Sequence, residues 1–88
     1  MLAEKVEIYS KEGCMFCVQA KMIFEIAKFP IIEYKLDTDY TKEQFIEKFG
    51  NSTFPRILIN DKLIGGFSEL SNLILEKKIE INIPPKTI

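Results

Sequence analysis

The two cysteines of the chain stand at the point where its hydrophobic period changes. Upstream of them, residues 6–9 alternate apolar and polar side chains, which is typical of a strand. Downstream, residues 18–28 are apolar at helical spacing, and the apolar face holds Ala20, Ile23, Phe24 and Ala27. The sequence therefore predicts a strand that leads through Cys14 into a helix, with Cys17 one turn along the same helix.

This position favours redox chemistry at Cys14. The unpaired backbone N–H groups and the positive end of the dipole at a helix N-terminus stabilise a thiolate. Lys11 adds a positive charge three residues before the cysteine. Because Cys17 lies three residues after Cys14, one turn along the same face of the helix, the two sulfur atoms should be close enough to form a disulfide. We interpret the pair as a redox-active dithiol.

Two structural roles for the cysteines are weaker interpretations. A zinc site would need two further cysteine or histidine ligands, and the chain has two cysteines and no histidine. A purely structural disulfide around so short a loop has little use in a reducing compartment. Without histidine, the commonest general base is also absent, so any chemistry must rest on thiols, carboxylates, lysines and the backbone.

Length and charge narrow the remaining classes. At 88 residues, with 47% hydrophobic and 28% charged residues, the chain is expected to form one globular domain over residues 1–88. Twelve basic residues against 13 acidic ones give no electrostatic reason to expect a nucleic acid or an anionic membrane as partner. No apolar run reaches about 18 residues, and no signal peptide is evident near the start. We expect a cytoplasmic protein and a monomer.

The middle of the chain predicts two further elements after the first helix. That helix is expected over residues 15–28, ended by Pro30, and residues 31–36 are expected to form a second strand. Thr41 and Gln44 have the form of a capping box, which opens a short helix that ends at Gly50. Its side chains expected to point inward are Phe45, Ile46 and Phe49.

The last part of the chain predicts a hairpin and a helix. Residues 56–59 and 62–64 are expected to be strands joined by a tight turn at Asn60 and Asp61. Ser68 is the expected N-cap of a helix over residues 69–78. Its inward side chains should be Leu70, Leu73 and Ile74, and residues 79–88 form a C-terminal extension with alternating isoleucines.

The predicted order of elements is β-α-β-α-β-β-α. A β-α-β unit followed by a hairpin implies an α/β fold, in which a four-stranded mixed sheet is flanked by three helices on its two faces.

Three separated motifs resemble those of the glutaredoxins, in the thioredoxin superfamily. Residues 11–17, Lys-Glu-Gly-Cys-Met-Phe-Cys, resemble the Lys-x-x-Cys-Pro-Tyr-Cys of that family. Residues 53–55, Thr-Phe-Pro, are similar to its Thr-Val-Pro, whose proline is cis. Residues 65–69, Gly-Gly-Phe-Ser-Glu, are similar to its Gly-Gly-x-(Ser/Thr/Asp)-Asp segment. The resemblance covers nearly the whole chain and implies a thioredoxin-like fold.

The resemblance implies a dithiol, glutathione-dependent thiol–disulfide oxidoreductase that reduces protein disulfides and glutathione mixed disulfides. Cys14 would be the nucleophile and would carry glutathione as a mixed disulfide until a second glutathione releases it. With a protein disulfide, Cys17 would resolve the intermediate. Glutathione would be a co-substrate, and the protein would hold no tightly bound cofactor and no metal. Protein disulfides, with ribonucleotide reductase among the candidate partners, would be the substrates.

The resemblance also implies where glutathione binds. Thr53 and the backbone of Phe54, beside a cis Pro55, would hold its main chain. Ser68 and Glu69 would receive its glutamyl end. The other residues that the resemblance places at the glutathione site are Lys11 and Lys42, for the glycine carboxylate, and Phe16, Gly66 and Phe67, at the border of the groove.

Two positions depart from the family pattern. Met15 stands where the family has proline, and Phe16 stands where it has tyrosine. Replacing the proline should change how tightly the dithiol is constrained, and therefore its redox potential.

Two other functions remain open. One is a thioredoxin-like electron donor to ribonucleotide reductase, reduced by a flavoprotein reductase, since such donors also tend to lack the proline. The other is a non-catalytic iron–sulfur module, in which two chains each give one thiolate and glutathione completes the ligands. The glycine pair with Ser68 and Glu69 favours glutathione over the first function, and the presence of Cys17 disfavours the second.

Overall fold

The computed structural model describes residues 2–78, so the extension expected at 79–88 lies outside the described residues. The elements are β1 (Val6–Ser10), α1 (Met15–Ile26), β2 (Ile32–Lys35), α2 (Lys42–Phe49), β3 (Arg56–Ile59), β4 (Lys62–Gly65) and α3 (Phe67–Leu75). Their order is the predicted β-α-β-α-β-β-α. No helix in this part of the chain is long and apolar enough to cross a membrane.

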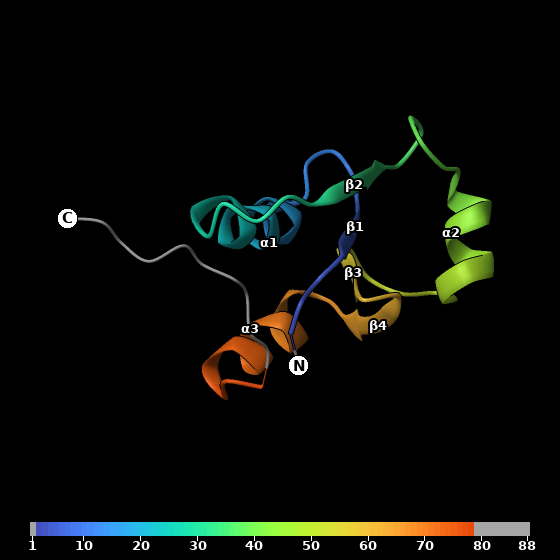
Figure 1. Ribbon diagram of the computed structural model, residues 1–88. Coiled ribbons are helices and arrows are strands. Elements are labelled where there is room, and N and C mark those ends of the chain that lie inside the picture. The colour runs from blue at the N-terminus through green and yellow to red at the C-terminus, as the bar shows by residue number, and fades with distance from the viewer. Residues whose placement is uncertain (1, 79–88) are drawn as a thin grey trace.

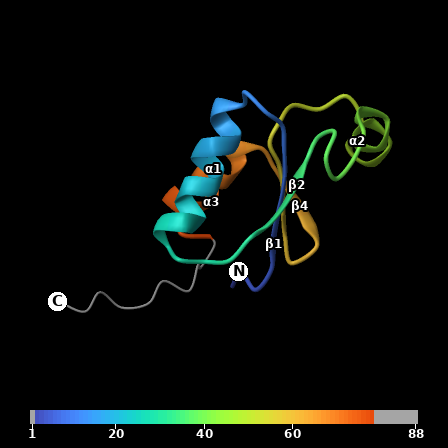
Figure 2. The same ribbon diagram turned by 90° about the horizontal axis from the view of Figure 1, so that it is seen from above.

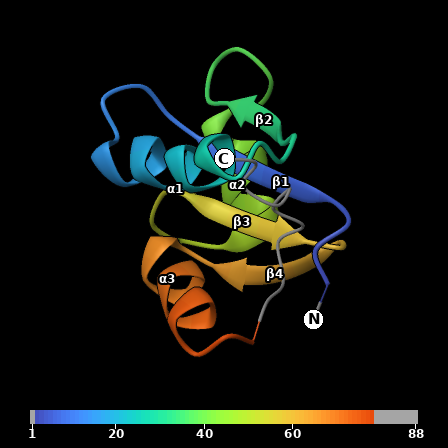
Figure 3. The ribbon, with the colours of Figure 1, turned by 60° about the vertical axis from the view of Figure 1, so that its left-hand side comes forward.

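The four strands form one mixed sheet in the order β2-β1-β3-β4 (Figure 3). β1 runs parallel to β2 and antiparallel to β3, and β4 returns antiparallel to β3. The parallel pair comes from the β-α-β unit and the antiparallel pair from the hairpin, as the sequence predicted. This is the thioredoxin-like arrangement, and it brings the C-terminal end of β1 beside the start of β3.

The helices cover both faces of the sheet. α1 and α3 lie side by side on one face and α2 lies on the other (Figures 1 and 2). Alternation along β1 and β3 sends every second side chain toward α1 and α3. The buried cluster between these layers is formed by Ala3, Val6, Ile8, Ala20, Phe24, Ile57, Ile59 and Leu70. It anchors α1, and therefore the cysteines at its N-terminal end.

The opposite face of the sheet is packed with aromatic rings. The Tyr9 ring lies 4.7 Å from Tyr34, 5.2 Å from Tyr40 and 4.9 Å from Phe49 of α2, measured between ring centroids. The Tyr40 hydroxyl donates a 2.6 Å hydrogen bond to the carbonyl of Ser10. Burial raises the pKa of Tyr40 to about 12, so this donor keeps its proton at neutral pH. These rings attach α2 to the sheet and fix the end of β1.

Two helices end earlier than predicted, and for the same reason. α1 ends at Ile26 because Lys28 takes a left-handed conformation, with φ of 56°, and Phe29 N–H donates to the Phe24 carbonyl. α3 ends at Leu75 because Lys77 does the same, with φ of 57°. Both ends are Schellman motifs, which commonly use glycine but here use lysine. Pro30 is therefore not the cause of the first ending.

Of three other local predictions, two are confirmed and one is wrong. The hairpin turn is as predicted, because Asn60 and Asp61 both have positive φ, 53° and 69°, the signature of a type I′ turn. The capping box of Thr41 and Gln44 is also present, with bonds of 2.8 and 3.2 Å. Ile46, however, was expected to point inward and is 39% exposed. Phe45 and Phe49 fill the space below α2, which leaves Ile46 at the surface.

Candidate functional site

Cys14 is the N-cap of α1. Its backbone is extended, with φ of −99°, and its Sγ accepts a 3.1 Å hydrogen bond from the backbone N–H of Cys17. The sulfur therefore occupies the place that a serine or threonine oxygen takes at an ordinary N-cap. The first turn of α1 contains no acidic residue that would oppose negative charge there. This confirms the predicted position of the first cysteine.

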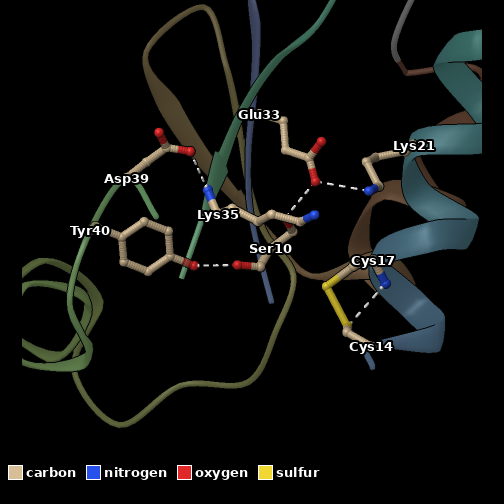
Figure 4. Close-up of polar contacts among 8 residues, drawn as sticks. All are labelled: Ser10, Cys14, Cys17, Lys21, Glu33, Lys35, Asp39 and Tyr40. Carbon is tan, nitrogen blue, oxygen red and sulfur yellow. Dashed lines mark hydrogen bonds and ion pairs between the residues drawn. A yellow bond between two sulfur atoms is a disulfide. The ribbon is translucent and has the colours of Figure 1, made fainter. Parts of the chain in front are cut away.

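The structure contains the oxidised form of the pair. A disulfide joins Cys14 to Cys17 across one helical turn, with their Cα atoms 5.2 Å apart (Figure 4). The two cysteines differ in exposure: Cys14 is 9% exposed and Cys17 is 1% exposed. Cys14 also lines the surface groove described next, whereas Cys17 lies beneath it. A substrate can therefore reach the sulfur of Cys14 first.

A groove of about 900 Å³ opens beside Cys14. It runs between the start of α1, the start of α2, the segment before β3 and the start of α3. The residues predicted to contact glutathione line this groove, with the exception of Pro55. Segments that are far apart in the sequence thus meet at one groove. Its volume is within the range that is typical of binding sites for small molecules.

Two phenylalanines form one wall of the groove. The rings of Phe16, from α1, and Phe67, from α3, are stacked with their centroids 5.7 Å apart. Phe16 is 56% exposed and Phe67 is half-buried. Both rings line the groove, and Phe67 also packs against the buried cluster of the core.

A second wall carries a cation above an aromatic pair. The Lys11 Nζ lies 5.1 Å from the centroid of the Phe54 ring, and that ring stacks on Phe45 at 4.2 Å. Lys42, the first residue of α2, is exposed and lines the same groove. Both lysines therefore place a positive charge at the groove.

The peptide bond between Phe54 and Pro55 is cis, as the resemblance implied. Pro55 itself is buried, and its neighbours Thr53, Phe54 and Arg56 line the groove. A molecule in the groove could therefore contact Thr53 and Phe54, whereas the buried Pro55 does not line the groove.

The N-terminus of α3 differs from the prediction. Gly66, and not Ser68, is the N-cap, and α3 begins at Phe67. The carboxylate of Glu69 accepts a 2.6 Å hydrogen bond from the Gly66 N–H, so a side chain one turn ahead does the capping. Ser68 lies in the first turn, exposed at the groove. This leaves the backbone at the start of α3 facing the groove, where a helix N-terminus favours an anion.

Arg56 lines the groove although its sequence position did not predict this. Its Nη2 donates a 3.3 Å hydrogen bond to Thr53 Oγ1, and its side chain lines the groove. A Cβ at Gly66 would lie 3.0 Å from the same Nη2, so the glycine makes room for the guanidinium. The available signal was the strand alternation, which buries Ile57 on one face and sends Arg56 to the other.

A polar network ties α1 to the sheet below the cysteines. The Glu33 carboxylate accepts hydrogen bonds from the buried Ser10 hydroxyl, at 2.6 Å, and from Lys21 Nζ, at 2.8 Å (Figure 4). Lys21 lies four residues after Cys17 on the same helix. Burial would raise the pKa of Glu33, but the bonds from Lys21 and Ser10 outweigh it and lower the pKa below its ordinary value. The carboxylate is therefore charged at neutral pH and fixes the rotation of α1.

Metal ligands are not clustered in the described part of the chain. Among residues 2–78, no group of three or more histidine, cysteine, aspartate or glutamate side chains could hold a metal ion.

The chain was compared with protein-family models and with curated proteins, and both comparisons match glutaredoxins. The family model described as glutaredoxin matches residues 6–64. The probable glutaredoxin slr1562 of Synechocystis sp. is 39% identical over 71 residues, which cover 78% of this chain and 65% of that protein. Glutaredoxin 3 of Escherichia coli K12 is 36% identical over 66 residues, which cover 74% of this chain and 80% of that protein.

Solved structures of glutaredoxins are also similar to this chain. The crystal structure of glutaredoxin 1 from Francisella tularensis complexed with cacodylate matches with a TM-score of 0.72 and 34% identity, over 84% of this chain and 95% of that one. The dithiolic glutaredoxin 2-C-Grx1 of Trypanosoma brucei brucei matches with a TM-score of 0.72 and 31% identity, over 84% and 80%. A buckwheat glutaredoxin–glutathione complex, at 22% identity, matches with a TM-score of 0.72 over 83% and 70%, which shows the shared fold.

Proposed function

Because this chain belongs to the glutaredoxin family, in which its Cys-x-x-Cys pair supports thiol–disulfide exchange, we propose that it is an oxidoreductase that uses glutathione as its reductant. One observation carries the proposal. The groove that holds Lys11, Phe54 and the start of α3 opens onto Cys14 and not onto Cys17. A ligand in this groove is therefore aligned with the more exposed sulfur.

The chemistry of the groove fits an extended peptide with two carboxylates. The segment at Thr53 and Phe54 offers backbone groups to the main chain of glutathione, as an exposed strand edge does. Lys11 and Lys42 supply cations for one carboxylate, and Arg56 adds a guanidinium, which can bind a carboxylate through two hydrogen bonds. The buckwheat relative of the same fold was crystallised with glutathione, which is consistent with this reading.

The start of α3 suits the glutamyl end of glutathione. Free backbone N–H groups of its first turn favour the α-carboxylate. Glu69 gives one carboxylate oxygen to Gly66, and its negative charge remains to attract the amino group. Ser68, exposed in the same turn, adds a hydroxyl. Both charged ends of the tripeptide would thus meet opposite charge.

The proposed reaction proceeds by two exchanges. The Cys14 thiolate attacks a glutathionylated substrate at the glutathione sulfur, and the substrate thiolate leaves and takes a proton from water. A second glutathione thiolate then attacks the Cys14-bound glutathione, releasing Cys14 thiolate and glutathione disulfide. One free glutathione is consumed for each mixed disulfide, and the other half of the glutathione disulfide is the glutathionyl group taken from the substrate. Cys17 is not needed in this sequence.

Protein disulfides use both cysteines. The Cys14 thiolate attacks one substrate sulfur and displaces the other as a thiolate. Cys17 loses its proton to solvent and attacks Cys14, which releases the second substrate thiolate and leaves the Cys14–Cys17 disulfide seen in the structure. Two glutathione molecules then reduce that disulfide. The 5.2 Å between the two Cα atoms is compatible with this closure.

A reductant comparison tests the proposal. The wild-type protein is given a small glutathione mixed disulfide, either with glutathione and glutathione reductase or with a flavoprotein thioredoxin reductase alone. We expect turnover with the glutathione system. Turnover with the flavoprotein reductase alone would instead favour the thioredoxin-like donor, for which exposed Met15, in place of the family proline, is the supporting observation.

A further inference from the structure

One face of α1 exposes a row of apolar side chains to solvent. Met15, Val18, Met22 and Ile26 are spaced three, four and four residues apart, so they lie along one line of the helix. They are 69%, 49%, 49% and 77% exposed. The opposite line of the helix, which includes Ala20 and Phe24, fills the core. We call this row of four side chains the α1 ridge.

The ridge is unusual within this molecule. The solvent face of α2 is built in the ordinary way, from exposed charged and polar side chains such as Glu43, Glu47 and Lys48. In α1, by contrast, the two charged residues lie to one side of the ridge. Lys21 is turned toward Glu33 on β2, and Glu25 is exposed at the edge. Contiguous exposed apolar surface on a small protein usually marks a site of interaction.

The ridge is continuous with the reaction centre. Met15 directly follows Cys14 in the chain and also lines the groove, so the groove ends where the ridge begins. From Met15 to Ile26 the helix rises about 16 Å. A disulfide substrate held at Cys14 therefore has an apolar track of this length beside it, of which only Met15 lines the groove.

We propose that the α1 ridge binds the apolar segment that flanks the reactive cysteine of a protein disulfide substrate. The proposal builds on the proposed function, because it concerns the same Cys14 exchange. Glutathione is too short to reach Met22 and Ile26 from Cys14 while it fills the groove, so the ridge serves protein substrates alone. It selects cysteines whose neighbours are apolar.

Peptide exchange with the Cys17→Ser variant tests this without glutathione. The Cys14 thiolate attacks a symmetrical peptide disulfide, which gives a Cys14–peptide disulfide and one free peptide thiol, and mass spectrometry gives the equilibrium constant. Two peptides of equal charge are compared, each of about eight residues, because an extended chain advances about 3.3 Å per residue. In one, leucine, isoleucine and valine follow the cysteine; in the other, serine, threonine and glutamine do.

The variants separate the ridge from apolar surface in general. Met22→Gln with Ile26→Gln removes the far half of the ridge and leaves the groove intact. Leu75→Gln is the matched control, because Leu75 is 76% exposed on α3 and lies off the ridge. We expect the parent to favour the apolar peptide roughly tenfold, a preference that even partial burial of two apolar side chains can supply. The ridge variant should lose this preference and the control should keep it.

Three results would overturn the proposal. The first is equal equilibrium constants for the two peptides in the parent. The second is a parent dimer in sedimentation that the ridge variant abolishes, which would assign the ridge to a second copy. The third is a ridge variant that keeps the full preference of the parent for the apolar peptide, or a Leu75→Gln control that loses it as completely as the ridge variant. Turnover of a small glutathione mixed disulfide, measured separately, reports on the proposed function and should be unchanged in the ridge variant.

Discussion

The Glu69 carboxylate accepts a 2.6 Å hydrogen bond from the backbone N–H of Gly66. This bond sets where α3 begins and therefore which backbone groups face the groove. It also explains the preceding glycine, since a Cβ on Gly65 would lie 2.6 Å from Glu69 Oε1 and φ is 128° there. The glycine pair thus gives room to a carboxylate on one side and to Arg56 on the other.

Glu69→Ala should destabilise the fold by about 1 kcal/mol, the usual effect of losing a helix cap. Urea unfolding at neutral pH measures this change. Glu76→Ala, at the other end of α3, is the control and should have a smaller effect. A Glu69→Ala variant as stable as the parent would mean that the bond to Gly66 does not hold the helix start.

Arg56→Ala should raise the KM for glutathione by roughly three- to tenfold, because a charged hydrogen-bond donor is removed from the groove. Lys62→Ala is the matched control, since Lys62 is an exposed cation on β4 that does not line the groove. Arg56→Lys should recover part of the loss. Equal KM values for the Arg56→Ala variant and the parent would remove Arg56 from the site.

Replacing either cysteine should separate their roles. Cys14→Ser should abolish all exchange, whereas Cys17→Ser should keep turnover of glutathione mixed disulfides and lose reduction of protein disulfides. The reason is geometric, because Cys14 lines the groove and Cys17 is 1% exposed beneath it. Steady-state assays on both substrate classes measure this. Loss of both activities in Cys17→Ser would contradict the assignment.

Glu33 should stabilise the fold only while it is charged. Its pKa in the folded protein lies below the ordinary value of 4.5, so its contribution is present above that value and is lost as pH falls through the lower folded pKa. The Tm of the parent should therefore exceed that of Glu33→Gln most at neutral pH, and the gap should shrink below pH 4.5. A gap that is the same at both pH values would contradict the charged bond to Lys21.

The sequence was sufficient where short-range chemistry decides the structure. The change of hydrophobic period placed Cys14 at a helix start, and the capping pair Thr41 and Gln44 placed the second helix. Asn60 and Asp61, two residues that tolerate positive φ, were enough to predict the hairpin. These features depend on residues within one or two turns of each other.

The sequence was insufficient where a competing contact decides. Serine is a common N-cap, which favoured Ser68. In the structure the Glu69 carboxylate instead accepts a hydrogen bond from the Gly66 N–H, so Gly66 is the N-cap and α3 begins at Phe67. Lys28 ends α1 in a left-handed conformation, which glycine usually takes at the end of a helix. Arg56 reads as an ordinary strand residue, because only the packed fold brings it beside Thr53 and Gly66.

The most direct test of the account is a glutathione adduct of the Cys17→Ser variant. The variant is incubated with glutathione disulfide, the product is checked by mass spectrometry, and backbone amide shifts are compared by NMR before and after. We expect one glutathione on Cys14 and shifts concentrated at Thr53, Phe54 and the first turn of α3. An adduct whose amide shifts leave those segments unchanged, or the absence of any adduct, would contradict glutathione binding in this groove.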